Sequence, residues 1–289
     1  MLRGVMRQEK RAYKMVLPFL TIIVGLVVYL VGTNVILSFT TEGGKFTLLN
    51  YVEVVTDPVL PTVILNTVLW TVGSVGGQIL VGFSIALLLN RIDFGEVFFR
   101  SILLILPWAT LDVVAGVTWK WMYNDMYGVI NDVLQNIGLI DQYLAWLGNT
   151  DLALPAVVIA NIWKGYCLAG IFFVAGLQGI PKQLYEVAEI DGANPLRQFI
   201  HVTLPQMREV ILTTLLLTTI WTINYFPLIY MMTGGGPGHA TETFATYIYR
   251  LSFSFLEFHE SAALSNILLV IIVFIAFFFL KKLNEGEGV

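Results

Sequence analysis

Two residues of opposite charge, Asp112 and Lys164, lie inside long apolar stretches of this sequence. A charge at the centre of a bilayer costs about 3 kcal/mol on insertion scales, so ionisable residues there are functional candidates by default. The two side chains can form a structural ion pair, or each can face a water-filled cavity and bind a polar solute. Lys164 can also extend its charge to the membrane interface. The possible chemistry is therefore hydrogen bonding to a solute or proton coupling through Asp112.

The sequence carries no arrangement typical of an enzyme. It has no evident nucleophile–base pair, metal-ligand set, CxxC pair, histidine cluster or nucleotide-binding lysine motif. The single Cys167 excludes an intrachain disulfide, and a net charge of −4 disfavours nucleic acid as a partner. We therefore expect no catalytic residue, no metal site and no cofactor on this chain, and a membrane enzyme is the least favoured class.

The elements that position Asp112 and Lys164 follow from hydropathy. The chain has 289 residues and is 57% hydrophobic and 12% charged, about half the charge of an average soluble domain. A helix needs about 20 apolar residues to cross a bilayer. We predict an all-α, polytopic membrane protein with about six transmembrane helices, at 16–38, 61–90, 98–122, 152–180, 210–232 and 262–282. Asp112 and Lys164 then fall mid-span in the third and fourth helices.

One polar stretch, EVAEIDGANPLRQFIHVTLP (186–205), interrupts this apolar pattern. Leu184, Val187, Ala188 and Ile190 have the spacing of a short amphipathic helix, and Gly192 suits the left-handed residue that ends one. Asn194-Pro195 begins a second helix, with one face lined by Leu196, Phe199, Ile200 and Thr203. Such a helix–glycine–helix segment suits a groove on another protein, although an interfacial helix between two spans is the alternative.

Basic residues predict the topology. If the loops alternate, twelve of the sixteen lysines and arginines fall on one side: Arg3, Arg7, Lys10, Arg11, Lys14, Arg91, Arg100, Lys182, Arg197, Arg208, Lys281 and Lys282. Cytoplasmic loops carry this excess. Both termini and the loop 181–209 are therefore expected in the cytoplasm, with a basic tail at 1–15, a permease domain at 16–283 and a short tail at 284–289. On the outer side, 46–58 and 127–147 are expected to form surface helices.

The polar stretch resembles the "EAA" signature of the membrane subunits of ABC importers. That signature has Glu, one residue and Ala, then Gly four positions after the Ala, and Leu-Pro a dozen positions further on. The matching residues are Glu186, Ala188, Gly192 and Leu204-Pro205; Val187 departs from the usual Ala, and Asp191 precedes the glycine. The resemblance implies that the loop inserts into a cleft of an ATPase subunit.

Further segments resemble the carbohydrate branch of these importers, in particular the MalF-like permease. They are TGGGPGHATETFATYIYRLSF (233–253), LLNYVEVVTDP (48–58), LPWA (106–109) and NIWKG (161–165). The resemblance covers nearly the whole chain and implies a type I ABC importer permease fold in the cell membrane. It also implies a second MalF/MalG-type permease, an ATPase dimer that binds ATP and Mg, an extracellular solute-binding protein and a sugar substrate.

By the same resemblance, the sugar contacts fall on a defined set of positions. Thr218, Thr222 and Tyr225 are spaced by four and three residues, hence on one helical face. Aromatic, amide and hydroxyl groups suit a polyhydroxyl solute. The implied positions are Trp108, Asp112, Asn161, Lys164, Gly165, Leu168, Thr218, Thr222 and Tyr225, with Asn224 beside them.

Two alternatives remain open at this stage. One is a permease of the same family for glycerol phosphate or another polyol derivative, with Lys164 serving the phosphate. The other is a secondary transporter coupled to protons through Asp112, although such proteins often show internal repeats and none is evident here.

Overall fold

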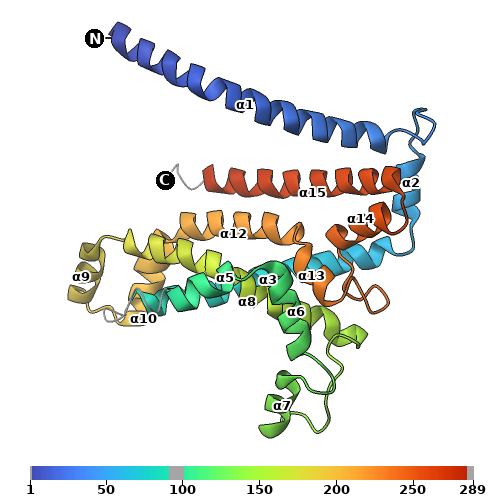
Figure 1. The fold of residues 1–289 in the computed structure, drawn as a ribbon. Helices are drawn as coiled ribbons and strands as arrows, with labels where there is room; N and C mark the ends of the chain where they lie inside the picture. The colour runs from blue at the N-terminus through green and yellow to red at the C-terminus, as the bar shows by residue number, and fades with distance from the viewer. Residues whose placement is uncertain (1, 91–100, 285–289) are drawn as a thin grey trace. The chain divides into compact units, whose positions relative to one another are not determined.

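The structure is a computed structural model that describes residues 2–90 and 101–284 (Figure 1). These residues are nearly all helical, and within them the extended pairing is limited to one isolated bridge, Thr40 with Phe46. The all-α prediction is therefore confirmed. The chain divides into two compact units, one of residues 1–57 and 248–269 and the other of residues 58–247 and 270–289.

The first unit contains α1 (Leu2–Ser38), α2 (Leu49–Thr56) and the beginning of α15 (Phe258–Asn284). Side-chain hydrogen bonds join α1 to α15: Asn34 donates to the buried Asn266 at 2.8 Å, and Asn266 donates to the Ser38 hydroxyl at 2.8 Å. α1 begins at Leu2, so the predicted tail 1–15 is helical from Leu2 and continues into the apolar part of α1 that begins at Val16. The predicted surface helix 46–58 is the shorter α2.

The second unit is centred on α3 (Leu60–Leu89) and α8 (Thr150–Gln178), which pack against each other along their lengths. Small buried residues such as Ala86, Ala160 and Cys167 lie in this core beside Trp70 and Phe173. Small side chains allow membrane helices to approach closely, so the contact between α3 and α8 forms a scaffold on which the other helices of this unit are placed.

The predicted span 98–122 is not one helix. Residues 98–100 lie outside the described chain, and the rest forms a π-helical turn (Ser101–Ile105), α5 (Leu106–Ala109) and α6 (Asp112–Met122). Thr110 and Leu111 are extended, and the axis bends by 101° between the two parts. Asp112 therefore opens α6 at the bend and does not lie in the middle of a continuous helix.

The predicted span 210–232 is also interrupted. It is divided into α12 (Arg208–Ile223) and α13 (Pro227–Met232) by a short break. Pro227 has no backbone N–H to donate within a continuing helix, but it is well suited to open a new one. Asn224 and Tyr225 thus lie in the break, at the end of the threonine-bearing helix.

Fewer helices than the six predicted spans are long and apolar enough to cross a membrane on their own. Four are long and apolar enough to cross a membrane, namely Val16–Ser38, Leu60–Leu89, Thr150–Gln178 and Phe258–Leu283, and the bent pair Ile102–Ala109 with Asp112–Met122 makes up to five among the described residues. α12 has 16 residues and is shorter than these.

Two irregular segments complete the second unit. Between α6 and α8, the predicted surface helix 127–147 is reduced to α7 (Val129–Asn136). Turns follow α7, and the buried Asn131 of α7 is hydrogen-bonded to them. Its side chain accepts from the Trp146 indole at 2.8 Å and donates to the Leu144 carbonyl at 3.0 Å. The glycine-rich loop before α14 (Phe244–Phe253) encloses Glu242, which is fully buried with His239 at 3.2 Å.

Candidate functional site: a polar pocket among five helices

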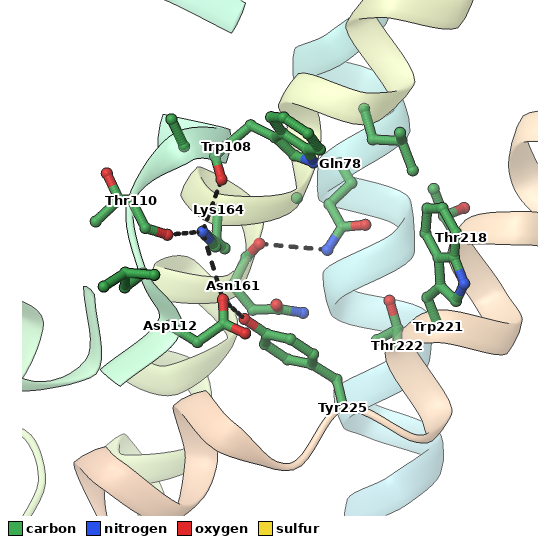
Figure 2. A pocket seen from close by; sticks show the side chains of 14 residues that line it. Gln78, Trp108, Thr110, Asp112, Asn161, Lys164, Thr218, Trp221, Thr222 and Tyr225 are labelled. Atoms are coloured by element: carbon green, nitrogen blue, oxygen red, sulfur yellow. Dashed lines mark hydrogen bonds and ion pairs between the residues drawn. The ribbon is translucent and has the colours of Figure 1, made fainter. Parts of the chain in front are cut away.

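A cavity of about 420 Å³ lies in the second unit, between α3, α5, α6, α8 and α12 (Figure 2). Its wall combines indole rings, amides, hydroxyls and one pair of charges. Its lining residues are Gln78, Trp108, Ala109, Thr110, Leu111, Asp112, Asn161, Lys164, Gly165, Leu168, Thr218, Trp221, Thr222 and Tyr225.

Asp112 and Lys164 form an ion pair at one side of this cavity. The Lys164 Nζ atom lies 3.4 Å from Asp112 Oδ1, and the Tyr225 hydroxyl donates to the same oxygen at 2.6 Å. Figure 2 shows the three side chains meeting from α8, α6 and the break after α12. The sequence left open whether the two charges meet or act apart, and the fold brings them together.

Lys164 also closes the end of a helix. Where a helix ends, its last carbonyl groups lack partners within the helix. At the bend after α5, the Lys164 ammonium donates to the backbone carbonyls of Pro107 at 3.3 Å, Trp108 at 3.1 Å and Thr110. One lysine of α8 therefore satisfies the carbonyls released by the bend, and the bend places Asp112 beside it.

Two buried amides line another part of the pocket. Gln78 of α3 is 3% exposed and donates from Nε2 to the Asn161 backbone carbonyl at 3.2 Å. The Gln78 side chain occupies the space beside Gly165, where an added Cβ would lie 2.3 Å from Nε2. The Nδ2 atom of Asn161 is buried and has no hydrogen-bond partner among the described residues. Asn161 therefore carries an unsatisfied amide donor in the wall of the cavity, but the atom itself is not exposed to the cavity.

The third side of the pocket is the hydroxyl face of α12. Thr218 and Thr222 are both buried, and the Thr218 hydroxyl donates to the Thr214 carbonyl at 2.7 Å. A hydrogen bond holds α12 against α3: Trp70 of α3 donates from Nε1 to the Thr222 carbonyl at 2.9 Å. The predicted common face of Thr218, Thr222 and Tyr225 thus lines the cavity.

The fold gathers nearly all the residues implied for the solute path. Asn224 is the exception, since its side chain donates to the Ile220 carbonyl at 3.0 Å and it is not a lining residue. The sequence analysis missed Gln78, Ala109, Thr110, Leu111 and Trp221. Gln78 carried a usable signal, because an amide inside an apolar span is a functional candidate on the same grounds as a charge.

The signature loop forms the predicted helix–glycine–helix segment at the end of the second unit away from α7 (Figure 1). α9 (Lys182–Ile190) precedes Gly192 at φ +76°, and Asn194 caps α10 (Pro195–Gln198) by accepting from the Arg197 N–H at 2.9 Å. α9 has no buried residue. The apolar side chains of Val187, Ile190 and Leu196 are 57%, 85% and 65% exposed within this chain.

Beyond α10 the second predicted helix changes form. A π-helical turn (Phe199–Thr203) and α11 (Leu204–Gln206) lead into α12. Leu196 and Thr203, predicted to share one face, differ in burial, because Thr203 is buried and contacts the Tyr185 hydroxyl at 2.9 Å. Leu204 and Pro205 begin α11, the last short helix before α12.

The exposed apolar helices and the polar pocket between them define a helical, multi-pass membrane protein. The chain belongs to the family described as "binding-protein-dependent transport system inner membrane component", whose model matches residues 1–286. It is thus a cell-membrane permease of the sugar ABC importer family, as its resemblance to that family implied.

Characterised relatives and solved structures agree with this family. The chain is 35% identical to the trehalose/maltose transport system permease MalF of Thermococcus litoralis, over 97% of this chain and 95% of the relative. It is 34% identical to the sulfoquinovosyl glycerol transport permease SmoG of Agrobacterium fabrum, over 82% and 76%. A chain of the bacterial alginate ABC transporter, solved with an alginate pentasaccharide-bound periplasmic protein, has a TM-score of 0.80 at 21% identity, with 94% of each chain covered. That match shows the type I permease fold.

Proposed function

We propose that this chain forms part of the route by which an ATP-driven importer carries a sugar or oligosaccharide across the membrane, and that the pocket of Figure 2 lies on that route. The observation that supports this most directly is a polar cavity among apolar helices, lined by amides, hydroxyls, indole rings and one pair of charges. Hydroxyl groups of a sugar form hydrogen bonds with such polar side chains, and its C–H faces pack on indole rings such as Trp108 and Trp221.

The route requires partners. A second MalF/MalG-type permease completes the path, and an extracellular binding protein delivers the solute. The relatives' names refer to trehalose, maltose and sulfoquinovosyl glycerol, all of which contain sugar units. Trehalose and maltose are uncharged and sulfoquinovosyl glycerol is an anionic sulfonate, so these names support a sugar-containing solute here and leave its charge to the pocket.

Energy comes from a separate ATPase dimer that binds ATP and Mg. The exposed apolar side chains of α9 and α10 suit a cleft on that dimer, and Glu186 adds an exposed charge. The lysines and arginines of the loop 181–209 and of both termini predict that these segments lie on the cytoplasmic side. Closure of the ATPases then moves the loop and changes the access of the pocket.

Reconstitution tests the proposal. The chain, its partner permease, the ATPases and the binding protein are placed in proteoliposomes, and uptake of labelled trehalose and maltose is followed with ATP inside or outside. We expect uptake only when ATP is on the ATPase side, and none when the ATPase carries an inactivating substitution in its nucleotide site. Uptake driven by a proton gradient without ATP would instead establish a secondary transporter.

A further inference from the structure

We propose that the pocket admits uncharged polyhydroxyl solutes and rejects anionic ones, because its lysine is fully engaged by oxygen atoms of the chain. This inference rests on the proposed function, since it names the class of solute that the same pocket accepts. It also separates the sugar hypothesis from the glycerol phosphate alternative, for which Lys164 would have to bind an anion.

The ammonium group of Lys164 has no donor left for a solute anion. An ammonium has three N–H donors, and Lys164 is surrounded by one carboxylate oxygen and the carbonyl oxygens of Pro107, Trp108 and Thr110. Its side chain is only 12% exposed. To bind a phosphate or carboxylate, Lys164 would have to leave the carbonyls that it caps at the bend.

The group that faces the cavity more openly is the acid. The Asp112 side chain is 37% exposed, three times the exposure of its partner. Tyr225 donates to Oδ1, the oxygen that also contacts Lys164. A sugar hydroxyl can donate to the carboxylate, whereas an anionic group there meets a like charge.

The other lining residues offer no positive charge. Among the residues that line the cavity in the described part of the chain, Asp112 and Lys164 are the only charged ones. The remaining polar side chains belong to Gln78, Trp108, Thr110, Asn161, Thr218, Trp221, Thr222 and Tyr225. They are neutral groups: the amides and hydroxyls can donate or accept hydrogen bonds, and the two indole N–H groups can donate. None of them supplies a positive charge to pair with an ionised solute, whose burial without a partner is costly.

The sign of the field in the pocket can be measured without knowing the solute. Leu168 lines the cavity one helical turn after Lys164, and Cys167 is the only cysteine of the chain and is buried. Leu168→Cys is introduced into a Cys167→Ala chain within the assembled complex. Its modification rate is measured with methanethiosulfonates of similar size that carry a sulfonate, a trimethylammonium or no charge. Each modification rate is divided by the rate at which the same reagent reacts with 2-mercaptoethanol in solution, which corrects for the reagents' different intrinsic reactivity. The Cys167→Ala chain without the new thiol is the control.

We expect the sulfonate reagent to react about tenfold more slowly than the other two, because the more exposed member of the Asp112–Lys164 pair is the carboxylate, so the negative end of the pair faces the cavity. Asp112→Asn in the same chain should remove most of this difference. Equal or faster reaction of the sulfonate reagent in the chain that retains Asp112 would overturn the inference, as would failure of the uncharged reagent to react. Neither result depends on sugar uptake, so failure of the proposed function would be recognised separately in the reconstitution.

Discussion

At the scale of single residues, the pocket depends on side chains that satisfy more than one neighbour. Lys164 neutralises Asp112 and also caps the carbonyls at the end of α5. Its removal therefore leaves both an unpaired charge and unsatisfied backbone acceptors. Removal of one member of a buried pair is strongly destabilising, because the remaining charge has lost its partner.

Substitutions of the charge pair should be non-additive. We expect Lys164→Leu to reduce sugar uptake and to lower the unfolding free energy, by less than the ~3 kcal/mol typical of a fully buried pair, because Asp112 is 37% exposed. The double change Asp112→Asn with Lys164→Leu should reduce uptake and stability less than Lys164→Leu alone, because no carboxylate is then left without its cation. Uptake in proteoliposomes and thermal unfolding of the purified complex measure both effects. Strict additivity of the single effects would show that the two groups do not interact.

The contact between Gly165 and Gln78 gives a second prediction at this scale. Gly165→Ala places a Cβ within 2.3 Å of the Gln78 amide and should displace it from the Asn161 carbonyl. We expect a several-fold rise in KM for sugar uptake, with the complex still assembled. Gly76→Ala on α3 is the matched control, because nothing lies within 4 Å of its added Cβ. Equal effects of the two substitutions would contradict a role for the Gln78 position.

At the scale of elements, the bend after α5 and the turn after α9 perform separate tasks. The bend places Asp112 in the pocket, whereas the turn at Gly192 sets the direction from α9 to α10. Gly192 has φ +76°, in the left-handed region that residues with a Cβ adopt only with strain. The backbone of this turn, and not the pocket, should therefore control docking of the ATPase.

Substitutions at Gly192 test this separation. A β-branched residue at φ +76° is strained by about 1–3 kcal/mol, so Gly192→Val should weaken both co-purification of the ATPase and uptake. Gly192→Asn is the matched variant, because asparagine tolerates left-handed geometry, and it should retain most of both. The relative rates of uptake of different sugars should be the same in both variants, and changed relative rates would argue against this division of roles.

At the scale of the whole molecule, the asymmetry of charge along the chain predicts its orientation. The loop 123–151 contains no lysine or arginine, whereas the loop 181–209 contains Lys182, Arg197 and Arg208. The positive-inside rule therefore predicts that the first loop lies outside the cell and the second in the cytoplasm.

Reporter fusions check this orientation. A reporter inserted at Gly148, between α7 and α8, should be active only as an external reporter, and one at Asn194, between α9 and α10, only as a cytoplasmic one. As the control, the cytoplasmic reporter is inserted at Gly148 and the external reporter at Asn194, and both should be inactive. Reversed signals would remove the ATPase-docking role of the loop, because a cytoplasmic ATPase would have no access to it.

The sequence by itself determined the features that depend on composition and local pattern. Apolar length predicted where the membrane helices lie, because each must satisfy its own backbone hydrogen bonds in lipid. The spacing from Glu186 to Pro205 identified the family and the helix–glycine–helix segment. The cost of burying charge singled out Asp112 and Lys164.

Only the tertiary structure decided how those residues meet. The break at Thr110 and Leu111 carries no strong local signal, since it depends on Lys164 of α8, 54 residues later, capping the released carbonyl of Thr110. The partner of Asp112 and the place of Gln78 beside Gly165 depend likewise on the packing of α3, α6 and α8. Contacts between distant segments arise from shape and mutual hydrogen bonding, which hydropathy and spacing along one chain do not encode.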